Sequence, residues 1–380
     1  MTAALAEFLD DDVAGAPGGQ GGTPLCTLVR GLLERGSRVT VCSLDPTVRD
    51  RVTLRGELLT LRYGPYRKRR HMRDGMALER RTIRDLICES SPDMVNAHWS
   101  YEYALGAMAS GYPTLVTVHD WAPAILRYAP IPYWFARQFM YFRAVLGASA
   151  LVAVSPYLGD KLERIAGRPA TVIPDAVEPS WFTETPREPQ GGLAPLLLSV
   201  NSGFTALKNV ATLLEALPLI RLAVPGCRLT LVGPGFETEG PADRWATARR
   251  LTAGVEFVGV LPTSGVRAQL AQSDVLVHPS RSESFGMPII EAMARRTPVV
   301  AGQASGAVPW VLDGGRAGAL TDVGSPLSLA AAVAALLTDT ALWTRCSEAG
   351  YRRARAHFST GRVVDQYLDA YERLLAQEHG

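Results

Sequence analysis

The sequence predicts an α/β protein made of two doubly wound, Rossmann-like domains that face a central cleft. Its 380 residues are enough for two or three domains of ordinary size. Short apolar, β-branched runs alternate along the chain with helical patterns, as expected for strands that are buried on both faces of a parallel sheet. A segment rich in proline and glycine, 179–195, separates two sets of five or six such strands and is interpreted as a linker.

The expected elements follow in order. The first strand is expected at Ala3–Leu9, before a loop with four glycines (Gly18, Gly19, Gly21 and Gly22) and a helix. The other expected strands are Arg38–Ser43, Met94–His98, Thr114–His119, Ala150–Val154, Thr171–Pro174, Leu196–Val200, Arg228–Val232, Val255–Val258, Asp274–His278 and Pro298–Ala301. The expected helices include Leu25–Arg35, Arg80–Glu89, Asn209–Ala223, Pro326–Leu337 (with Ser325 as its N-cap) and Ala341–His357.

These elements predict a first domain at 1–178 and a second at 196–360. The last segment, 361–380, follows the completed second domain, and its residues Gly361–Glu378 have the pattern of an amphipathic helix.

Composition excludes several classes of protein. With 47% hydrophobic and 20% charged residues the chain is not disordered, and a net charge of +2 does not by itself argue for nucleic acid. The longest apolar run, Leu329–Leu337, is too short to cross a bilayer. The first twelve residues are acidic where a signal peptide has a basic start, so a cytoplasmic location is expected. Five scattered cysteines predict neither a disulfide framework nor a zinc site. The Ala-, Gly- and Arg-rich composition hints at a bacterial source.

Open α/β sheets bind ligands beyond the carboxyl ends of their strands, so the residues that follow each strand are the candidates. In the first domain, the loop at Gly21 and Gly22 allows close approach of a phosphate or sugar, although it does not fit the G-x-G-x-x-G pattern of nicotinamide dehydrogenases. His119 and Asp120 end another strand, where the histidine is a candidate for binding a sugar hydroxyl or stabilising developing charge. His98 has a similar position and is interpreted as structural.

The strongest signal lies in the second domain, after the strand Asp274–His278. The string ESFGMPIIE places Glu283 in a loop, Gly286 at a tight turn and Glu291 near the start of a helix. Free N–H groups at a helix start can hold a diphosphate, and a carboxylate there can accept hydrogen bonds from two ribose hydroxyls. Lys208, after the strand Leu196–Val200, is a candidate for neutralising a phosphate.

Taken together, these motifs resemble those of nucleotide-sugar glycosyltransferases of the GT-B fold, and most of all the retaining glycosyltransferase family four. The resemblance runs along nearly the whole chain, and its most specific piece is the pair of glutamates Glu283 and Glu291. The matching strings are the loop Gly18–Gly22, LLERGSRVTV, VNAHW, PTLVTVHD, LVAVSPYL, TVIPDAV, LKN at 207–209, LTLVGPG, VEFVGVL, SESFGMPIIEAMARRTPVVAG and VLDGGRAGAL.

The resemblance implies transfer of a sugar to a hydroxyl acceptor with retention at the anomeric carbon, without a metal ion or other cofactor. Glu291 would hold the ribose, and Lys208 the diphosphate. Glu283 and the backbone of Phe285, Gly286 and Met287 would bind donor sugar and phosphate. His119 would line the reaction pocket, and the loop at Gly21–Gly22 would close on a substrate. The last helix would pack back on the first domain.

Three positions depart from the family pattern. Gly203 stands where an arginine often precedes the lysine by five residues, Asp175-Ala176 replaces Asn-Gly, and Pro309-Trp310 replaces Pro-Glu. These departures leave the donor base and sugar open.

The acceptor side is less determined. Asp120, Trp121 and the aromatic segment that follows them are candidates for an acceptor wall or a membrane-touching helix, with ordinary core packing as the alternative. The stretch 62–84 holds nine Arg and Lys residues against two acidic ones, which suits an anionic membrane surface, an acidic acceptor or a solvated loop and helix.

Three functions therefore stay open. The first is a glycosyltransferase that makes a cell-surface glycan or modifies a small molecule such as an antibiotic. The second is an isomerase or epimerase of the nucleotide sugar itself, and the third is a sugar-nucleotide binder without catalysis.

Overall fold

The computed structural model describes residues 1–69, 71–188 and 194–378. The chain divides into two compact units. The first is Met1–Ala176 with Thr360–Gly380, and the second is Val177–Ser359.

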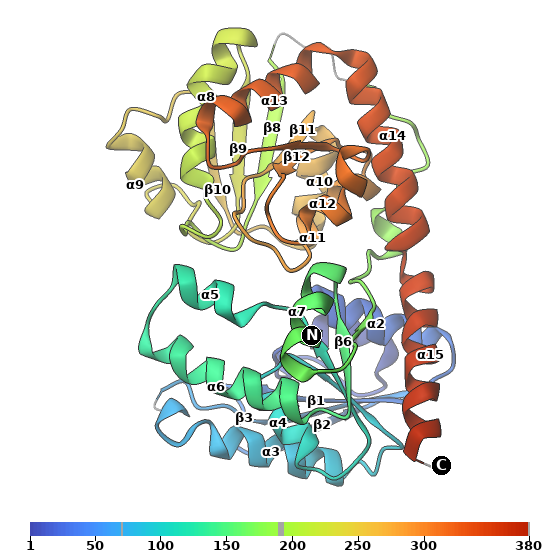
Figure 1. The fold of residues 1–380 in the computed structure, drawn as a ribbon. Helices are drawn as coiled ribbons and strands as arrows, with labels where there is room; N and C mark the ends of the chain where they lie inside the picture. The colour runs from blue at the N-terminus through green and yellow to red at the C-terminus, as the bar shows by residue number, and fades with distance from the viewer. Residues whose placement is uncertain (70, 189–193, 379–380) are drawn as a thin grey trace. The chain divides into compact units, whose positions relative to one another are not determined.

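The second unit is a doubly wound α/β domain with one six-stranded sheet (Figure 1). Its strand order is β10-β9-β8-β11-β12-β13, and every neighbouring pair is parallel. The strands are β8 (Leu196–Val200), β9 (Arg228–Val232), β10 (Val255–Gly259), β11 (Val275–His278), β12 (Val299–Gly302) and β13 (Ala319–Thr321). The helices are η3 (Pro179–Trp181), α8 (Val210–Ala223), α9 (Pro241–Thr247), α10 (Thr263–Gln272), α11 (Met287–Ala294), α12 (Val308–Val311), η4 (Asp313–Gly315), α13 (Pro326–Thr338) and α14 (Thr340–His357).

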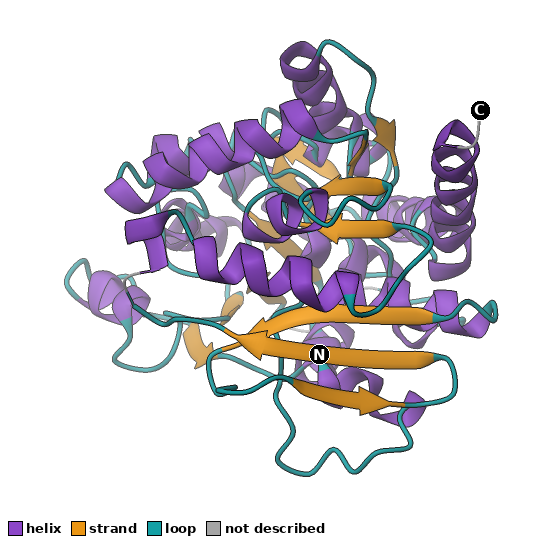
Figure 2. Ribbon diagram, turned by 90° about the horizontal axis from the view of Figure 1, so that it is seen from below, coloured by secondary structure: helices purple, strands orange, loops and turns teal. Residues whose placement is uncertain are grey.

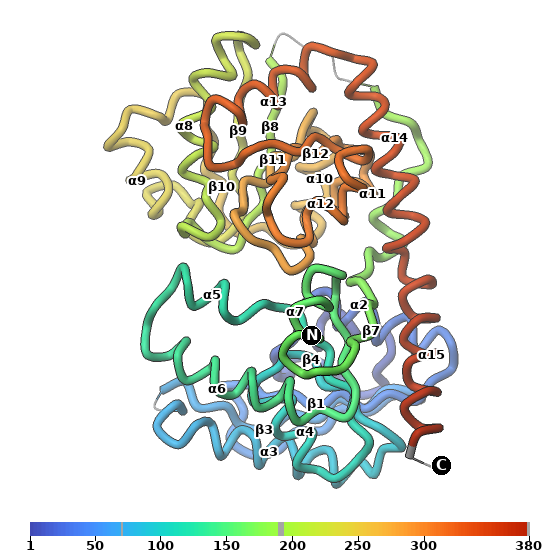
Figure 3. The backbone as a smooth tube through the Cα atoms, in the orientation of Figure 1, coloured from blue at the N-terminus to red at the C-terminus, as the bar shows by residue number. Residues whose placement is uncertain are grey.

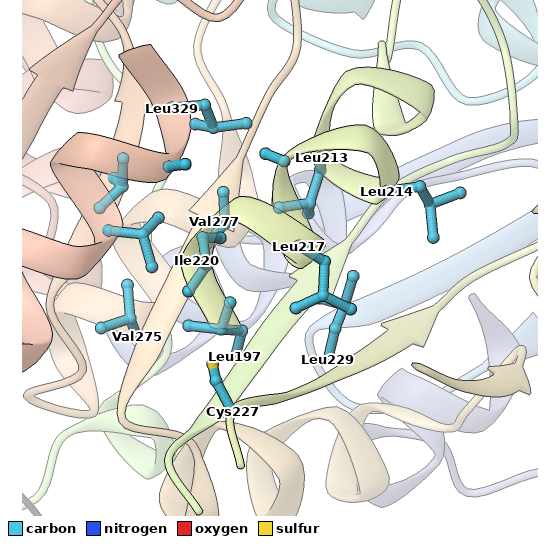
Figure 4. Packing of buried hydrophobic residues seen from close by; sticks show 14 of the residues in the cluster. Leu197, Leu213, Leu214, Leu217, Ile220, Cys227, Leu229, Val275, Val277 and Leu329 are labelled. Carbon is cyan, nitrogen blue, oxygen red and sulfur yellow. The ribbon is translucent and has the colours of Figure 1, made fainter. Parts of the chain in front are cut away.

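One apolar core holds this unit together. Leu197 and Val277, on neighbouring strands, pack with Leu217 of α8 and Leu329 of α13, and all four are fully buried (Figure 4). Burial of a leucine or valine side chain contributes about 1.5–3 kcal/mol. The α13 helix begins as the sequence predicts, with the Ser325 hydroxyl accepting a hydrogen bond from the N–H of Ser328.

The first unit contains two separate sheets. One has the order β1-β3-β2 and the other β4-β5-β6-β7. The strands are β1 (Val39–Asp45), β2 (Val52–Arg55), β3 (Leu59–Pro65), β4 (Val95–His98), β5 (Thr114–Val118), β6 (Ala150–Ala153) and β7 (Thr171–Val172). Figure 2 shows the smaller sheet beside the N-terminus, with two strands pointing one way and the third, β2, the other way. The second sheet is wholly parallel.

Helices flank both sheets of the first unit. They are α1 (Thr2–Leu5), η1 (Ala6–Phe8), α2 (Thr23–Glu34), η2 (His71–Asp74), α3 (Ala77–Cys88), α4 (Glu102–Met108), α5 (Ala122–Tyr128), α6 (Pro132–Gly147), α7 (Pro156–Ala166) and α15 (Thr360–Glu378). The C-terminal helix α15 lies beside α2 (Figure 3), where Val363 and Val364 pack with Leu28 and Leu32.

The prediction of a first strand at Ala3–Leu9 is wrong, because these residues form α1 and η1. Alanine, leucine and glutamate favour helix over strand, and together they make up six of the seven residues of the segment. Its burial is one-sided, with Leu5 fully buried and Glu7 exposed. The predicted strands that begin at Arg38, Met94, Thr114, Ala150, Thr171, Leu196, Arg228, Val255, Asp274 and Pro298 are confirmed within a few residues.

The segment expected to be a linker begins within the second unit. Trp181 in η3 is 2% exposed, and the Arg187 guanidinium donates to the hydroxyl of Thr297 over 2.7 Å. The structure therefore attaches 179–188 to the second unit, and 189–193 lie outside the described residues.

Among the described residues, no single helix has the length and apolarity needed to cross a bilayer. The bent pair α13 and α14 meets those limits only when its two helices are joined. Leu329 and Trp343 of this pair belong to the buried core of the second unit.

The contact between α2 and α15 gives a prediction for stability. A Cβ on Gly31 would lie 2.5 Å from Cγ2 of Val364 and 2.9 Å from Cγ2 of Thr360. Gly31→Ala is expected to destabilise the protein by about 1–3 kcal/mol, because overpacking outweighs the better helix propensity of alanine. Glu34→Ala, at an exposed position of the same helix, is the control. Urea unfolding that shows equal stability for both variants would contradict this packing.

Candidate active site

The loop between β11 and α11 is held in place by hydrogen bonds that other segments donate to its backbone carbonyl groups. Asn209 donates through Nδ2 to the carbonyl of Pro279 over 3.1 Å, and the Ser305 hydroxyl donates to the carbonyl of Ser280 over 2.6 Å. The N–H of Ala307 donates to the carbonyl of Glu283 over 2.9 Å. Gly286 precedes α11 with φ +107°, a conformation that favours glycine, so the ESFGMP string makes this turn.

Glu283 is the centre of a charged cluster at the carboxyl end of β11. Its Oε1 lies 2.6 Å from Nζ of Lys208 and 3.0 Å from Nε2 of His278. Burial of the carboxyl group would raise its pKa, but the Lys208 ammonium and the His278 ring lower that pKa well below its usual range. The carboxylate is therefore ionised, and it holds the lysine at the edge of the sheet.

Glu291 has the opposite electrostatic environment, eight residues further along the chain. Burial raises the pKa of its carboxyl group to about 7, and no cation or donor among the described residues offsets this effect. The group lies in α11, where the N–H groups of the first turn favour anions. A half-buried carboxylate whose charge no neighbouring group offsets, within a short helix, is typical of a binding site that a ligand completes.

The side chains of Phe285 and Met287 have different roles. Phe285 is 3% exposed and packs edge-to-face against Phe358, with ring centroids 5.5 Å apart. Its side chain belongs to the core, so only its backbone is available to a donor. Met287 is half-buried at the first position of α11, so its N–H belongs to the first turn, whose donors have no partner within the helix.

In the first unit, His119 forms a chain of polar contacts that crosses three strand ends. Its Nδ1 lies 3.3 Å from Oδ1 of Asp175, and its Nε2 lies 2.8 Å from Nδ1 of His98. Burial lowers the pKa of His119, but the Asp175 carboxylate outweighs burial and raises it above its ordinary value. Burial and the neighbouring His119 lower the pKa of His98. Of these two rings, His119 is therefore the one that takes up a proton first as the pH falls.

Asp120 lies beside this chain among aromatic rings. Its Oδ2 accepts a hydrogen bond of 2.8 Å from the hydroxyl of Tyr101. Its Oδ1 is buried without a partner in the described part of the chain, and burial raises the pKa of the carboxyl group. Trp121 packs edge-to-face on Tyr141 and carries the Lys161 ammonium 4.8 Å from its ring centroid. The unpartnered Oδ1 of Asp120 can accept a hydrogen bond from a hydroxyl.

The glycine loop is tied to the carboxyl end of β1. The N–H of Gln20 donates to Oγ of Ser43 over 2.9 Å, and the N–H of Gly19 donates to Oδ2 of Asp45 over 2.8 Å. Gly22 is the N-cap of α2, and Gly21 precedes it. The left-handed residue of the loop is Gly19, with φ +69°, so the conformational need for glycine falls there.

The predicted site residues thus lie at strand ends and helix starts within each unit. The structure brings Lys208 and Glu283 into contact, and it joins His119 to a neighbouring strand end. The sequence reasoning missed His278, and it treated His98 as structural and Asp175 only as a departure from the family pattern. His278 and His98 each end a strand, as His119 nearly does, so the same signal would have found them.

The unpaired Glu291 gives a prediction about pH and stability. Its pKa in the folded protein, about 7, lies above the ordinary 4.5, so folding favours the protonated form. Stability is therefore lost as pH rises from about 4.5 through 7, because the buried group must ionise. Glu291→Gln is expected to be more stable than the parent by about 1–3 kcal/mol at pH 8 and equal to it near pH 4.5. Urea unfolding at both pH values tests this, and a constant difference would contradict it.

The chain of His98, His119 and Asp175 gives a second prediction. Asp175→Asn removes the charge that favours protonated His119, so the pKa of that ring should fall below its ordinary value. Ring-proton NMR titration measures it directly, with Asp160→Asn on the exposed face of α7 as the control. A His119 pKa that does not move in Asp175→Asn would show that the contact is not an ion pair.

Comparison with known proteins gives matches in both units. The family model described as Glycosyltransferase Family 4 matches residues 21–181, and the one described as Glycosyl transferases group 1 matches 187–353. A glycogen synthase of Mycobacterium tuberculosis is 28% identical over 298 residues, which are 74% of this chain and 68% of the relative. A phosphatidyl-myo-inositol mannosyltransferase of the same species is 33% identical over 215 residues, 54% of each chain.

Solved structures share the fold. A sucrose-phosphate synthase from Thermosynechococcus elongatus has a TM-score of 0.77 at 21% identity and covers 95% of this chain and 96% of its own. Anabaena HepE, solved in complex with UDP-glucose, has a TM-score of 0.70 at 18% identity and covers 94% and 98%. With both units matched by glycosyltransferase models and the motifs in place, the chain is a GT-B glycosyltransferase of the family four type.

Proposed function

We propose that this enzyme transfers a sugar from a nucleoside-diphosphate donor to a hydroxyl acceptor, with retention of anomeric configuration and without a metal ion. The observation that carries the proposal is the arrangement around α11. The Glu283 cluster with Lys208 lies at the end of β11, and the uncompensated Glu291 lies in the helix that follows.

Each part of a donor has a matching group in the second unit. Vicinal ribose hydroxyls would donate to the Glu291 carboxylate, which lowers its raised pKa and relieves its burial cost. The diphosphate would take Lys208 as its counter-ion and the first-turn N–H groups of α11 as donors. Glu283 would accept hydrogen bonds from the sugar. The UDP-glucose complex of HepE supports a donor of this class.

The transfer itself breaks the bond between the anomeric carbon and the diphosphate oxygen and forms a bond to the acceptor oxygen on the same face. The proton of the acceptor hydroxyl passes to the departing diphosphate. Positive groups that face the departing diphosphate stabilise its developing charge. Lys208 and α11 supply them, which supports catalysis without a metal ion. Protonated His119 is assigned to a sugar hydroxyl in the reaction pocket, and Asp120, with its unpartnered oxygen, to the acceptor hydroxyl.

The acceptor is proposed to be a glycan, a lipid-linked sugar or a small molecule, as in cell-surface glycan or antibiotic biosynthesis, within the cytoplasm of a bacterium. The mannosyltransferase relative supports a lipid-linked acceptor. Ion pairs reduce the positive charge that the stretch 62–84 could offer to a membrane surface, because Arg62, Arg67 and Arg84 each contact a carboxylate. Lys68 and Arg73 are exposed, and Arg70 lies outside the described residues.

Thermal shift with UDP, GDP, ADP, dTDP and their common sugar conjugates identifies the donor. A ligand at 100 times its dissociation constant adds about 2.7 kcal/mol to stability. Incubation of the responding conjugate with and without acceptor hydroxyls then separates transfer from isomerisation, because an isomerase or epimerase converts the donor alone. No response to any nucleotide would contradict the proposal.

Glu291→Ala is expected to weaken binding of the responding nucleotide about tenfold or more, because a charge-assisted hydrogen bond contributes roughly 1.5–3 kcal/mol. Isothermal titration measures this, with Glu215→Ala on the exposed face of α8 as the matched control. His119→Ala should bind the nucleotide normally and lose turnover. Unchanged affinity in folded Glu291→Ala would remove the ribose assignment.

Chelation tests the metal-independent part of the proposal. Turnover is expected to stay within twofold in excess EDTA, and added Mg²⁺ or Mn²⁺ should not raise it. Loss of turnover with EDTA and its recovery with either cation would show that the diphosphate needs a metal ion.

A further inference from the structure

The two sheets of the first unit leave an open slot between them. In the described chain, β1 pairs only with β3, and β4 pairs only with β5, so both are edge strands. A cavity of about 740 Å³ is lined by Val39–Cys42 of β1, and by Met94 and the whole of β4, Val95–His98. The cavity therefore lies along two sheet edges, where backbone N–H and C=O groups lack ladder partners.

The helices α2, α3 and α4 give the slot an apolar wall, through Leu25, Leu28, Val29, Leu32, Ile83, Ile87 and Ala107. Polar residues from the strands, the loops and α15 also line it, among them Ser90, Asp93, Asn96, His98, His119, Asp175 and Tyr371. Protein interiors rarely contain a void much larger than a water molecule. The two sheets also pack into separate apolar clusters, one with Leu115 and Val152 and the other with Leu59 and Leu61, whereas a domain usually has one contiguous core.

In the second unit, a strand occupies the position that corresponds to the slot. There β8 precedes α8, and β9 follows it; in the sheet, β8 lies between β9 and β11. In the first unit, α2 likewise precedes β1, but no strand precedes α2 in 1–22. The place that corresponds to β8, between β1 and β4, is the cavity.

The residues before α2 do not fill the slot, because they form contacts with other parts of the unit. The N–H of Asp10 donates to the carbonyl of Arg55 over 2.9 Å, which fixes this segment to β2. The Thr2 hydroxyl is 2.6 Å from that of Tyr63, and Glu7 forms an ion pair with Arg30. Moving Ala3–Leu9 into the slot would break these contacts and bury the Glu7 carboxylate.

A small-molecule ligand is also a poor match. The cavity extends to Ser37, Arg38 and Pro92, at the amino ends of β1 and β4. Ligands of open α/β sheets bind beyond the carboxyl ends of the strands. A space that follows the length of two parallel edges has the form of a missing strand.

We propose that the slot holds a parallel β-strand of about five uncharged, apolar residues, supplied by residues that precede Met1 in a longer form of this polypeptide. Strands rise about 3.3 Å per residue, and four or five residues of each edge line the slot. A central parallel strand is buried on both faces and is therefore continuously apolar.

The position of Met1 supports this source. Gly21 and Gly22 line the slot, and a Cβ on Gly21 would lie 3.3 Å from Sδ of Met1. This is the carboxyl end of the slot, because the N–H of Gln20 donates to the carbonyl of Leu44 near the end of β1. A strand that runs parallel to β1 and β4 would leave the slot next to Met1.

Such a strand would join the two sheets and the two apolar clusters into one. His98 and His119 also line the slot, so the strand would complete the wall behind the polar chain that contains them. The inference does not depend on the glycosyl donor, and its tests need no activity measurement.

The direct test is the mass of the protein expressed from its own gene with the upstream reading frame retained. We expect a mass above 41.0 kDa and an N-terminal sequence with an apolar, β-branched run before Met1. A protein of 41.0 kDa that begins at Met1 would overturn the proposal.

A second test uses designed chains. The 380-residue chain is compared with a form that carries a five-residue Val/Ile strand and a short Gly/Ser linker before Met1. The control has proline at the centre of the added strand, which removes a ladder donor.

Hydrogen exchange at the amides of Thr40 and Asn96 should slow at least tenfold in the extended form and return to the starting rate in the proline control. These N–H groups face the slot, because those of the preceding residues Val39 and Val95 donate toward β3 and β5. The melting temperature should rise in parallel. Equal exchange in all three proteins would overturn the proposal. Full protection of β1 and β4 in the 380-residue chain, with fast exchange at Leu5, would show that its own residues fill the slot, and would overturn it too.

Discussion

A buried parallel strand needs a hydrogen-bonding partner on each edge and an apolar cover on each face. The second unit meets this requirement across β9, β8, β11 and β12, which have neighbours on both sides. Because those strands are parallel, their carboxyl ends meet at one edge of the sheet, and the loops that carry Lys208 and Glu283 gather there. The charged cluster of the second unit is thus a consequence of sheet construction. In the first unit the same requirement is unmet between β1 and β4, which is why a cavity lies there.

Two glutamates eight residues apart have opposite electrostatic roles. Glu283 is ionised because Lys208 and His278 contact it, whereas burial without a partner raises the pKa of Glu291 to about 7. Ion pairing organises the loop in advance, and the uncompensated carboxylate leaves a favourable interaction for a ligand to supply. In the first unit, Asp175 and His119 form an organised pair, while Asp120 keeps one oxygen unpartnered. Each unit therefore combines an ion pair with a carboxylate, Glu291 or Asp120, that can accept a hydrogen bond from a ligand.

Much of this arrangement follows from the sequence. Apolar β-branched runs identified the parallel strands because such strands are buried on both faces, and the position of Glu283 and Glu291 around Gly286 identified the site. The sequence analysis does not predict the hairpin of β2 and β3, because LTLRYG alternates apolar and polar residues, whereas the predicted strands are continuous apolar runs. The prediction of a strand at Ala3–Leu9 is wrong, because a short apolar segment before a glycine loop resembles a strand, while its residues favour helix. The contacts of Lys208 with Glu283 and of Asp175 with His119 join elements distant in sequence, and no local pattern encodes them.

The central claim is that the carboxyl edge of the second unit binds a nucleoside diphosphate through Glu291 and Lys208. A crystal structure of the protein with the nucleotide that stabilises it tests this most directly. The account predicts both ribose hydroxyls within hydrogen-bond distance of the Glu291 carboxylate, and the diphosphate at Nζ of Lys208 and at the first turn of α11. A nucleotide bound elsewhere, with Glu291 still buried and unpartnered, would contradict it.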